Sequence, residues 1–317
     1  MVRIYFATDV HGSDQVWRKW ANVPLVHGAE ILILSGDLTG KSIVPIIKQK
    51  DNTYACSIFG RNWKLTSETE VHEMEEKIRF TGYYPYVCAP EDVLELQKNP
   101  KKLDQLFIDL MRARIKSWME FIVEKVNTKE KTVLVMPGND DELGIDDVIK
   151  SYEDRGIIYP LGKVINLCYD YEMISLDYVN PTPWNTPREC SEEELDKKVK
   201  AEVEKIKDHS KAIYNLHCPP YNTRLDLAPK LDKKLKPVYI LGDPVFEHVG
   251  GKAIRKAEEE KQPMLGLHGH IHESFASDVI GKTVVLNPGS EYTEGILRGF
   301  IIDLSEKGVE RYWKVEG

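Results

Sequence analysis

Five short apolar runs in this chain each end in a few polar residues, and this repetition is the feature that most constrains the fold. The polar ends are Asp9-Val10-His11, Gly36-Asp37, Gly138-Asn139-Asp140, His217-Cys218 and His268-Gly269-His270-Ile271-His272. Short, near-continuous apolar runs are typical of strands that are buried on both faces, as in parallel sheets. In open α/β sheets, ligand sites form just beyond the carboxyl ends of the strands. We therefore predict an α/β protein whose functional site gathers these five strand ends.

The segment from Met264 to Ser274 has the highest density of histidine, with His268, His270 and His272 at alternating positions. On an extended backbone, alternation sends all three side chains to the same face. Three neighbouring imidazoles would repel one another if they were protonated, so the segment favours a bound cation. The alternative is a polar turn that is rich in histidine, and this segment alone does not decide between the two.

The polar residues at the strand ends are of the types that bind divalent transition metals. They combine carboxylate or amide oxygens with imidazoles, and they are Asp9, His11, Asp37, Asn139, His217, His270 and His272. This mixture suits first-row divalent ions better than Ca²⁺ or an iron–sulfur cluster. Seven side chains exceed the roughly four protein ligands of a single zinc ion. We therefore predict two ions about 3.5 to 4 Å apart with a carboxylate between them.

The order DxH, GD, GN(D), H and GHxH resembles that of the calcineurin-like metallophosphoesterases, and it runs from residue 9 to residue 272. The segments NPTPWNTPRE, HVGGKAIR and LNPGSEY are similar to a prokaryotic subgroup of predicted phosphoesterases. The resemblance implies an α/β fold in which two mixed sheets are flanked by helices, a four-layer αββα sandwich. It further implies which residues hold each ion: Asp9, His11 and His272 the first, Asn139, His217 and His270 the second, with Asp37 bridging. His268 falls outside the pattern and is expected to be structural.

The function that the resemblance implies is hydrolysis of a phosphomonoester or phosphodiester by attack of a metal-bridging hydroxide. The expected cofactors are two divalent ions, Mn²⁺ first, with Fe²⁺, Zn²⁺ or Ni²⁺ as alternatives. Many relatives have a histidine directly after the Asn139 position, where this chain has Asp140 followed by Asp141, which are candidate catalytic acids. Because an ordinary aspartate has a pKa of about 3.9, it is a poor proton donor at neutral pH unless desolvation or the neighbouring Asp141 raises that pKa. We therefore expect a preference for substrates with good leaving groups.

Composition limits the partners and the compartment. The chain has 43 Lys and Arg against 51 Asp and Glu, a net charge of -8, which does not favour nucleic acid or an anionic membrane. The basic run from Lys230 to Lys236 is the local exception, and we interpret it as a solvated loop. Five scattered cysteines and a first strand in place of a signal peptide predict a cytoplasmic protein. The expected partner is a small phosphorylated substrate, with no membrane and no nucleic acid, and the oligomeric state stays open.

The chain is predicted to form a single domain, residues 1–317, with a mainly helical insertion at about 60–130. Apolar spacing predicts a helix over about 103–126 that packs through one face. Another helix is expected near 245–261. The tyrosine-rich loop at 83–86 either packs or forms part of a substrate wall. A nuclease, or a catalytically silent scaffold that binds a protein, are the alternative functions.

Overall fold

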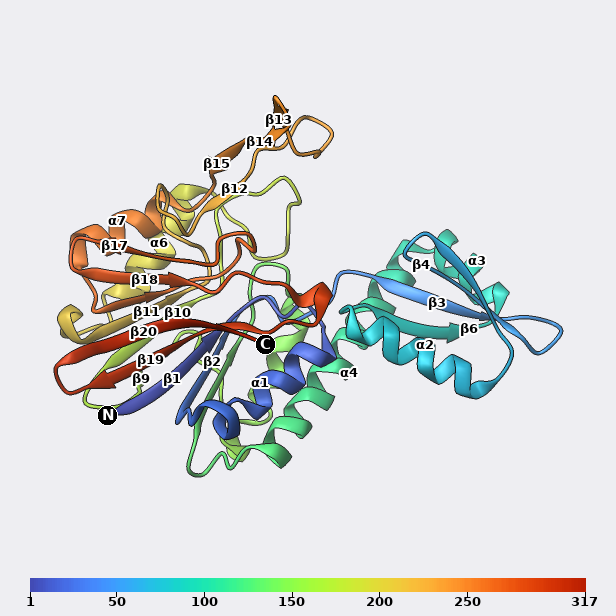
Figure 1. Ribbon diagram of the computed structural model, residues 1–317, viewed down its shortest axis with the longest axis horizontal. Coiled ribbons are helices and arrows are strands. Elements are labelled where there is room, and N and C mark those ends of the chain that lie inside the picture. Colours follow the sequence, from blue (N-terminus) through green and yellow to red (C-terminus); the bar gives the residue numbers. More distant parts are fainter.

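The computed structural model describes residues 1–317, and it contains two six-stranded sheets packed face to face (Figure 1). The order of strands is β20-β19-β1-β2-β7-β8 in the first sheet and β17-β18-β16-β11-β10-β9 in the second. The strands of the first sheet are β1 (Val2–Ala7), β2 (Ile31–Ser35), β7 (Thr132–Met136), β8 (Ile157–Ile158), β19 (Arg298–Ser305) and β20 (Gly308–Glu316). Those of the second are β9 (Ile165–Asn166), β10 (Glu172–Leu176), β11 (Ala212–Leu216), β16 (Leu265–Leu267), β17 (Ala276–Ile280) and β18 (Thr283–Asn287).

Helices cover the outer side of each sheet, which completes four layers. Those of the main body are α1 (Asp14–His27), α4 (Pro100–Lys125) and α5 (Asp146–Lys150) beside the first sheet, and α6 (Glu192–Val203) and α7 (Lys252–Lys261) beside the second. Alternation along β1 shows the arrangement: Ile4 and Phe6 belong to the core between the sheets, whereas Tyr5 and Ala7 pack with α1 and α4. The αββα sandwich implied by the sequence motifs is confirmed.

Parallel pairing brings the predicted strand ends together. Strand β2 lies parallel to both β1 and β7, and β16 lies parallel to both β11 and β18. Each of these strands is followed directly by a turn, and the turns of β1, β2, β7, β11 and β16 carry the polar motifs. The carboxyl ends of five strands from two sheets therefore meet at one edge of the sandwich.

The segment between β2 and β7 has a sheet of its own, and two of its strands lie within the insertion expected at about 60–130. Its strands and helices are β3 (Ile43–Lys48), β4 (Tyr54–Ile58), β5 (Arg61–Leu65), α2 (Glu68–Phe80), β6 (Tyr84–Cys88) and α3 (Pro90–Lys98), with strand order β5-β4-β3-β6. These elements form a lobe beside the main body (Figure 1). Over about 60–130 the chain is mainly helical, through α2, α3 and α4, and it also contains β5 and the edge strand β6, which tolerates Pro85. How the chain divides into domains stays a prediction.

Residues 227–248 form an arm that projects from the main body (Figure 1). It consists of two antiparallel pairs, β12 (Leu227–Pro229) with β15 (Phe246–His248) and β13 (Tyr239–Ile240) with β14 (Asp243–Pro244). The helix expected from residue 245 begins only at Lys252, because the preceding residues continue the arm. Short 3₁₀ turns complete the chain: η1 (Leu143–Ile145), η2 (Glu153–Arg155), η3 (His209–Lys211) and η4 (Tyr292–Glu294). No helix is long and apolar enough to cross a membrane.

Candidate metal centre

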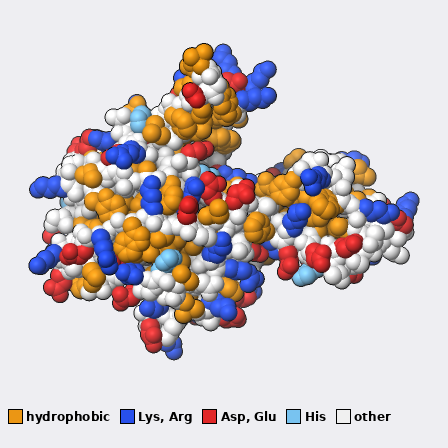
Figure 2. Space-filling model, in the orientation of Figure 1, with side chains coloured by type: hydrophobic (Ala, Val, Ile, Leu, Met, Phe, Trp, Pro, Cys, Tyr) orange, Lys and Arg blue, Asp and Glu red, His pale blue; other side chains and the backbone are white.

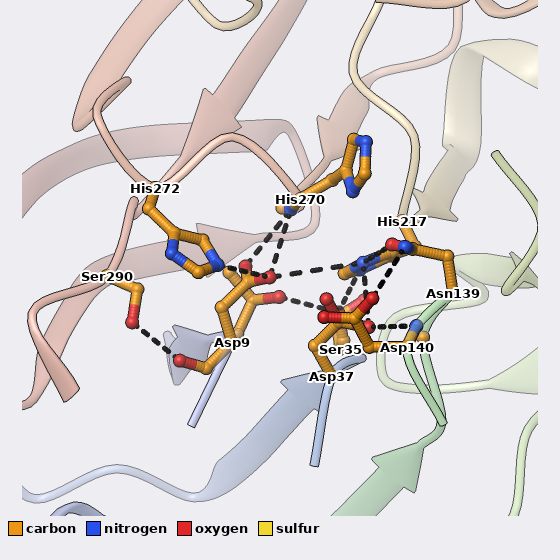
Figure 3. Close-up of polar contacts among 12 residues, drawn as sticks. Asp9, Ser35, Asp37, Asn139, Asp140, His217, His270, His272 and Ser290 are labelled. Atoms are coloured by element: carbon orange, nitrogen blue, oxygen red, sulfur yellow. Dashed lines mark hydrogen bonds and ion pairs between the residues drawn. The ribbon is translucent and has the colours of Figure 1, made fainter. Parts of the chain in front are cut away.

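The structure brings all seven predicted ligands into one cluster, in which five are buried and His270 and His272 are partly exposed (Figure 3). Two groups of donor atoms have every member within 4.8 Å of the others, and Asp37 belongs to both. The first group is Asp9, His11, Asp37 and His272, and the second is Asp37, His217 and His270. The seventh residue, Asn139, places its Oδ1 atom 3.1 Å from His217 Nε2. Asp37 therefore lies between two potential cation positions.

The separations of His11 and His217 from Asp37 fit shared cations better than hydrogen bonds. His11 Nε2 lies 3.6 Å from Asp37 Oδ2, and His217 Nε2 lies 3.4 Å from Asp37 Oδ1. Strong hydrogen bonds between such groups are shorter, at about 2.7 to 3.0 Å. Two ligands that each lie about 2.1 Å from one ion are separated by roughly 3 to 3.5 Å. The spacing is therefore that of atoms arranged around ions.

The contact between His217 and Asn139 gives a second indication that a positive charge belongs between these two side chains. His217 Nδ1 lies 2.9 Å from the carbonyl oxygen of Ser35, so this nitrogen carries a proton and donates it. The Asn139 amide donates to Thr186 Oγ1 at 2.9 Å, which turns its oxygen towards His217. In the neutral imidazole, Nε2 is an acceptor, and it would face another acceptor at 3.1 Å. A cation or an added proton must compensate here.

The charges around the centre lead to the same conclusion. Burial acts to lower the pKa of His217, but the carboxylates of Asp37 and Asp9 raise it to about 10. Burial lowers the pKa of His270 to about 4, so that imidazole is neutral and able to bind a metal. His11 Nδ1 is buried and makes no hydrogen bond. Two buried carboxylates therefore require nearby positive charge, and the donor set fits divalent ions.

Four of the candidate ligands have backbones in the left-handed region that normally favours glycine. The φ angles are 55° for Asp9, 39° for His11, 50° for Asp37 and 69° for His270. Each such conformation costs of order 1 to 3 kcal/mol in a residue that has a side chain. Specific contacts hold them: the His11 amide donates to the Asp37 carbonyl at 2.9 Å, and the His270 amide donates to Asp9 Oδ2 at 3.0 Å. Strain is concentrated at the residues whose side chains point into the cluster.

The three histidines of the last motif do not share one face, which corrects the prediction from alternation. Strand β16 ends at Leu267, and the left-handed conformation of His270 breaks the extended pattern. His268 points away from the cluster, where its Nε2 lies 3.0 Å from Glu258 Oε1 and its Nδ1 lies 2.9 Å from the Leu216 carbonyl oxygen. These contacts agree with the structural role expected for His268. His270 and His272 face the centre.

Asp140 and Asp141 lie in different surroundings although they are adjacent. Asp140 is at the rim, where its Oδ2 lies 3.8 Å from His11 Nδ1 and 2.6 Å from the ammonium of Lys41. Burial, together with the charge of Asp37, raises the pKa of Asp140 to about 6, while Lys41 acts in the opposite direction. Lys41 was not predicted to belong to the site, because nothing in the sequence places its side chain beside the third motif.

The Asp141 carboxylate is buried and fully used in holding two loops together. It accepts hydrogen bonds from the amides of Leu38, Thr39 and Gly138 at 2.8 to 2.9 Å, and from the Thr39 hydroxyl at 2.6 Å. These contacts join the turn after β2 to the turn after β7. They favour a positioning role for Asp141 over the catalytic role suggested by its sequence position.

The proline-rich loop at 180–188 supports Asn139 from outside the cluster. Besides the Thr186 contact, the Arg188 amide donates to the Asn139 carbonyl at 3.2 Å. The Arg188 guanidinium is buried, and its Nε donates to the Asp141 carbonyl at 2.8 Å. Glu189 holds the loop by accepting hydrogen bonds from Thr182 and Thr186. The motif NPTPWNTPRE lies in this loop, but nothing in the sequence predicted the contact with a candidate ligand.

Comparisons with known proteins agree with this fold. No protein-family model matches the chain. The uncharacterized protein MJ1162 of Methanocaldococcus jannaschii is 34% identical over 158 residues, which are 49% of this chain and 63% of that protein, less than two thirds of its length. One solved structure aligns over 98% of both chains with 14% identity and a TM-score of 0.58. Another, TT1561 of Thermus thermophilus, aligns over 100% of this chain and 98% of its own with 12% identity and a TM-score of 0.53.

These structural similarities show the fold, and the cluster adds the arrangement of donors. The chain shares its fold with these two solved structures, and its Asp, Asn and His residues gather at five strand ends, where its motifs predicted a site.

Proposed function

We propose that this protein is a phosphoesterase that uses two divalent metal ions. The observation that carries the proposal is the pair of donor groups that share Asp37, with all donor atoms of each group within 4.8 Å of one another. Asp9, His11 and His272 would hold one ion, Asn139, His217 and His270 the other, and Asp37 both. When bound, such a pair binds phosphate oxygens and activates water for attack on phosphorus. Mn²⁺ is our first expectation for both positions.

The protein's own side chains would orient this centre and meet the substrate at its rim. Ser35 fixes the tautomer of His217 through the 2.9 Å contact with Nδ1, which leaves Nε2 free to bind metal. Lys41 and Asp140 lie at the more exposed edge, with 48% and 16% of their side chains accessible. We propose that the Lys41 ammonium attracts the anionic substrate to this edge. The substrate is a small phosphate ester, and its remaining part is not specified by these contacts.

The contact between Lys41 and Asp140 supports the expected dependence on the leaving group. Burial and the charge of Asp37 raise the pKa of Asp140 to about 6, but the 2.6 Å ion pair with Lys41 stabilises the ionised form, so at pH 8 the carboxylate has almost no proton to donate. For a series of aryl phosphates, we expect the rate to rise steeply as the pKa of the leaving phenol falls. The slope should change little in Asp140→Asn, because asparagine also donates no proton by ionisation. A flat dependence in the wild type would show that another group protonates the leaving oxygen.

The test of the proposed function is a hydrolysis screen with metal-stripped protein. Aryl phosphomonoesters, aryl phosphodiesters and single-stranded DNA would each be tested after addition of Mn²⁺, Fe²⁺, Zn²⁺ or Ni²⁺. We expect hydrolysis of a small ester to require added metal and to fall at least a hundredfold in Asp37→Asn, because even residues that only orient ligands contribute about 10- to 100-fold. Asp303→Asn is the matched control, since Asp303 is a buried carboxylate that pairs with Arg3 outside the centre.

Each alternative function gives its own result in this screen. Faster cleavage of DNA than of small esters would identify a nuclease. Bound metal without hydrolysis of any substrate would favour the silent scaffold. Equal activity of wild type and Asp37→Asn would contradict the proposed centre.

A further inference from the structure

The arm formed by residues 227–248 exposes apolar side chains that the fold does not use. Leu235, Tyr239, Ile240, Leu241 and Phe246 are all exposed, with Ile240 63% accessible and Leu241 fully accessible. Figure 2 shows the end of the arm as an apolar patch that stands clear of the main body. Exposed apolar patches of this kind mark surfaces that contact a partner. The arm is therefore a candidate interaction site that is separate from the metal centre.

The two leucines at the turns of the arm have unfavourable backbone conformations. Leu241 and Gly242 form the two-residue loop between β13 and β14, with φ angles of 53° and 94°. Loops of this type strongly favour Asn-Gly, because both residues need a positive φ. Leu235, in the neighbouring turn, has a φ of 58°. At both positions the chain has an apolar side chain where folding alone favours asparagine or glycine.

Lysine side chains border the apolar end of the arm (Figure 2). Lys233, Lys234 and Lys236 are exposed and form no ion pair, although the protein as a whole has a net charge of -8. Two acidic residues lie at this end of the arm: Asp232, which accepts hydrogen bonds from the amides of Lys234 and Lys236 at 2.7 and 3.0 Å, and Asp243, which is exposed in β14. Local positive charge therefore lies beside exposed leucines on a projecting element.

We propose that the end of this arm inserts into the interface of an anionic lipid membrane. Apolar side chains bind such an interface by burial among the acyl chains, and lysines add attraction to anionic headgroups. Leu241 at the turn and its neighbours Tyr239 and Ile240 would enter the interface. The lysines of the adjacent turn would lie at the headgroups. This interpretation replaces the solvated loop expected for the Lys230 to Lys236 run, and it revises the expectation that the protein has no membrane contact.

A second copy of the chain fits this surface less well. A twofold contact between two arms would bring Lys233, Lys234 and Lys236 of one copy close to the same residues of the other. Like charges facing one another in a contact are unfavourable. An anionic bilayer, in contrast, complements both the lysines and the leucines.

The test measures binding of the full-length protein to vesicles by co-sedimentation. Vesicles of phosphatidylcholine alone would be compared with vesicles that contain 30 mol% phosphatidylglycerol, a composition of about the charge at which lysines add attraction. We expect binding to the anionic vesicles, weaker binding to the neutral ones, and release as NaCl increases. Replacing Lys233, Lys234 and Lys236 together with glutamine should weaken binding to anionic vesicles at least about tenfold.

The variant Leu241→Asn distinguishes a loss of membrane binding from a loss of folding of the arm. It creates the favoured Asn-Gly turn and removes the most exposed apolar side chain, so the arm stays folded while vesicle binding falls about tenfold. Leu25→Asn is the matched control, because Leu25 is 84% exposed on α1, outside the arm, and its replacement should leave binding unchanged.

Three results would overturn the proposal. They are no binding to anionic vesicles, equal binding by Leu241→Asn and wild type, and a dimer in solution that Leu241→Asn converts to monomer. The last would identify a second copy as the partner. None of these results depends on hydrolysis, so failure of the proposed function leaves this test intact.

Discussion

The metal centre and the end of the arm both contain non-glycine residues with a left-handed backbone conformation. Those of the centre are buried, whereas those of the arm are exposed to solvent. At the centre, Asp9, His11 and Asp37 are buried and are held by hydrogen bonds between loops. In the arm, Leu235 and Leu241 are exposed, and only a hairpin turn supports each of them. Both regions retain an unfavourable conformation in order to present a particular side chain.

The difference shows what supports such strain and what it costs. In the centre, the surrounding loops determine the backbone, so strain is compatible with a fixed geometry. In the arm, little surrounds the turn, so the strain weakens the hairpin itself. We infer that the centre is rigid because it must hold ions at set positions, whereas the arm needs only to display its leucines.

Gly138→Ala should disrupt the rigid centre, and among the three test substitutions Gly138→Ala, Thr186→Val and Leu241→Asn it has the largest expected effect. A Cβ atom at Gly138 would lie 2.3 Å from Asp37 Oδ1 and 2.8 Å from His217 Nε2, so the donors must move apart. We expect loss of bound metal and a decrease of about 1 to 3 kcal/mol in the free energy of unfolding, as for other overpacked sites. Metal analysis and denaturant unfolding measure the two effects.

Gly144→Ala is the control for that substitution. A Cβ atom there would meet only Ile108 Cγ2, at an ordinary 3.4 Å. Its metal content should equal that of the wild type. If Gly138→Ala also kept its metal, the centre would be more adaptable than its contacts indicate.

Thr186→Val tests how much the loops around the centre contribute to metal binding. It removes a hydrogen bond that orients Asn139 and leaves all seven candidate ligands in place. The Asn139 amide would lose its 2.9 Å contact with the Thr186 hydroxyl and keep the longer 3.2 Å contact with Asp140 Oδ1, so its oxygen would be held less firmly towards His217. We expect metal affinity to fall about tenfold, the lower end of the effect of residues that orient ligands. Titration of stripped protein with Mn²⁺ measures the change.

Thr182→Val tests whether the effect comes from the contact with Asn139. Thr182 also donates to Glu189, at 2.6 Å, but it does not reach Asn139. Its replacement should leave Mn²⁺ affinity unchanged. Equal losses in the two variants would mean that the loop acts as a whole and that the single hydrogen bond is unimportant.

Leu241→Asn should have the smallest effect on stability, and it should stabilise the protein, whereas Gly138→Ala destabilises it. Asparagine adopts the left-handed region more readily than leucine, so the hairpin should gain up to about 1 kcal/mol. Because the arm opens locally, hydrogen exchange of the Ile240 and Asp243 amides is the appropriate measurement, and it should slow about fivefold. Faster exchange would show that Leu241 stabilises the arm through contacts of its own.

The sequence predicted those parts of the structure that depend on local patterns. Apolar runs that end in Asp, Asn or His predicted parallel strands whose ends meet, and the two sheets confirm this. The order of the motifs predicted the αββα class. The residues expected to bind metal lie together, and metal binding itself stays a prediction.

The rest could not be predicted because it depends on how distant loops approach one another. Lys41 reaches Asp140 only when the turns after β2 and β7 are adjacent, and Thr186 reaches Asn139 across 47 positions of the chain. The prediction that His268, His270 and His272 share one face was wrong, because the left-handed conformation of His270 interrupts the extended backbone that it assumed. The strand Tyr84–Cys88 lies where a tyrosine-rich loop was expected at 83–86, because a strand that contains proline is found mainly at a sheet edge, and the edge depends on the tertiary fold.

Metal stoichiometry is the measurement that tests the central claim most directly. Stripped protein would be saturated with Mn²⁺, freed of excess ion, and analysed for metal per chain. Because Asp37 belongs to both donor groups, the wild type should bind two ions and Asp37→Asn should lose at least one. A folded wild-type protein that binds one ion or none at saturation would contradict a two-metal centre.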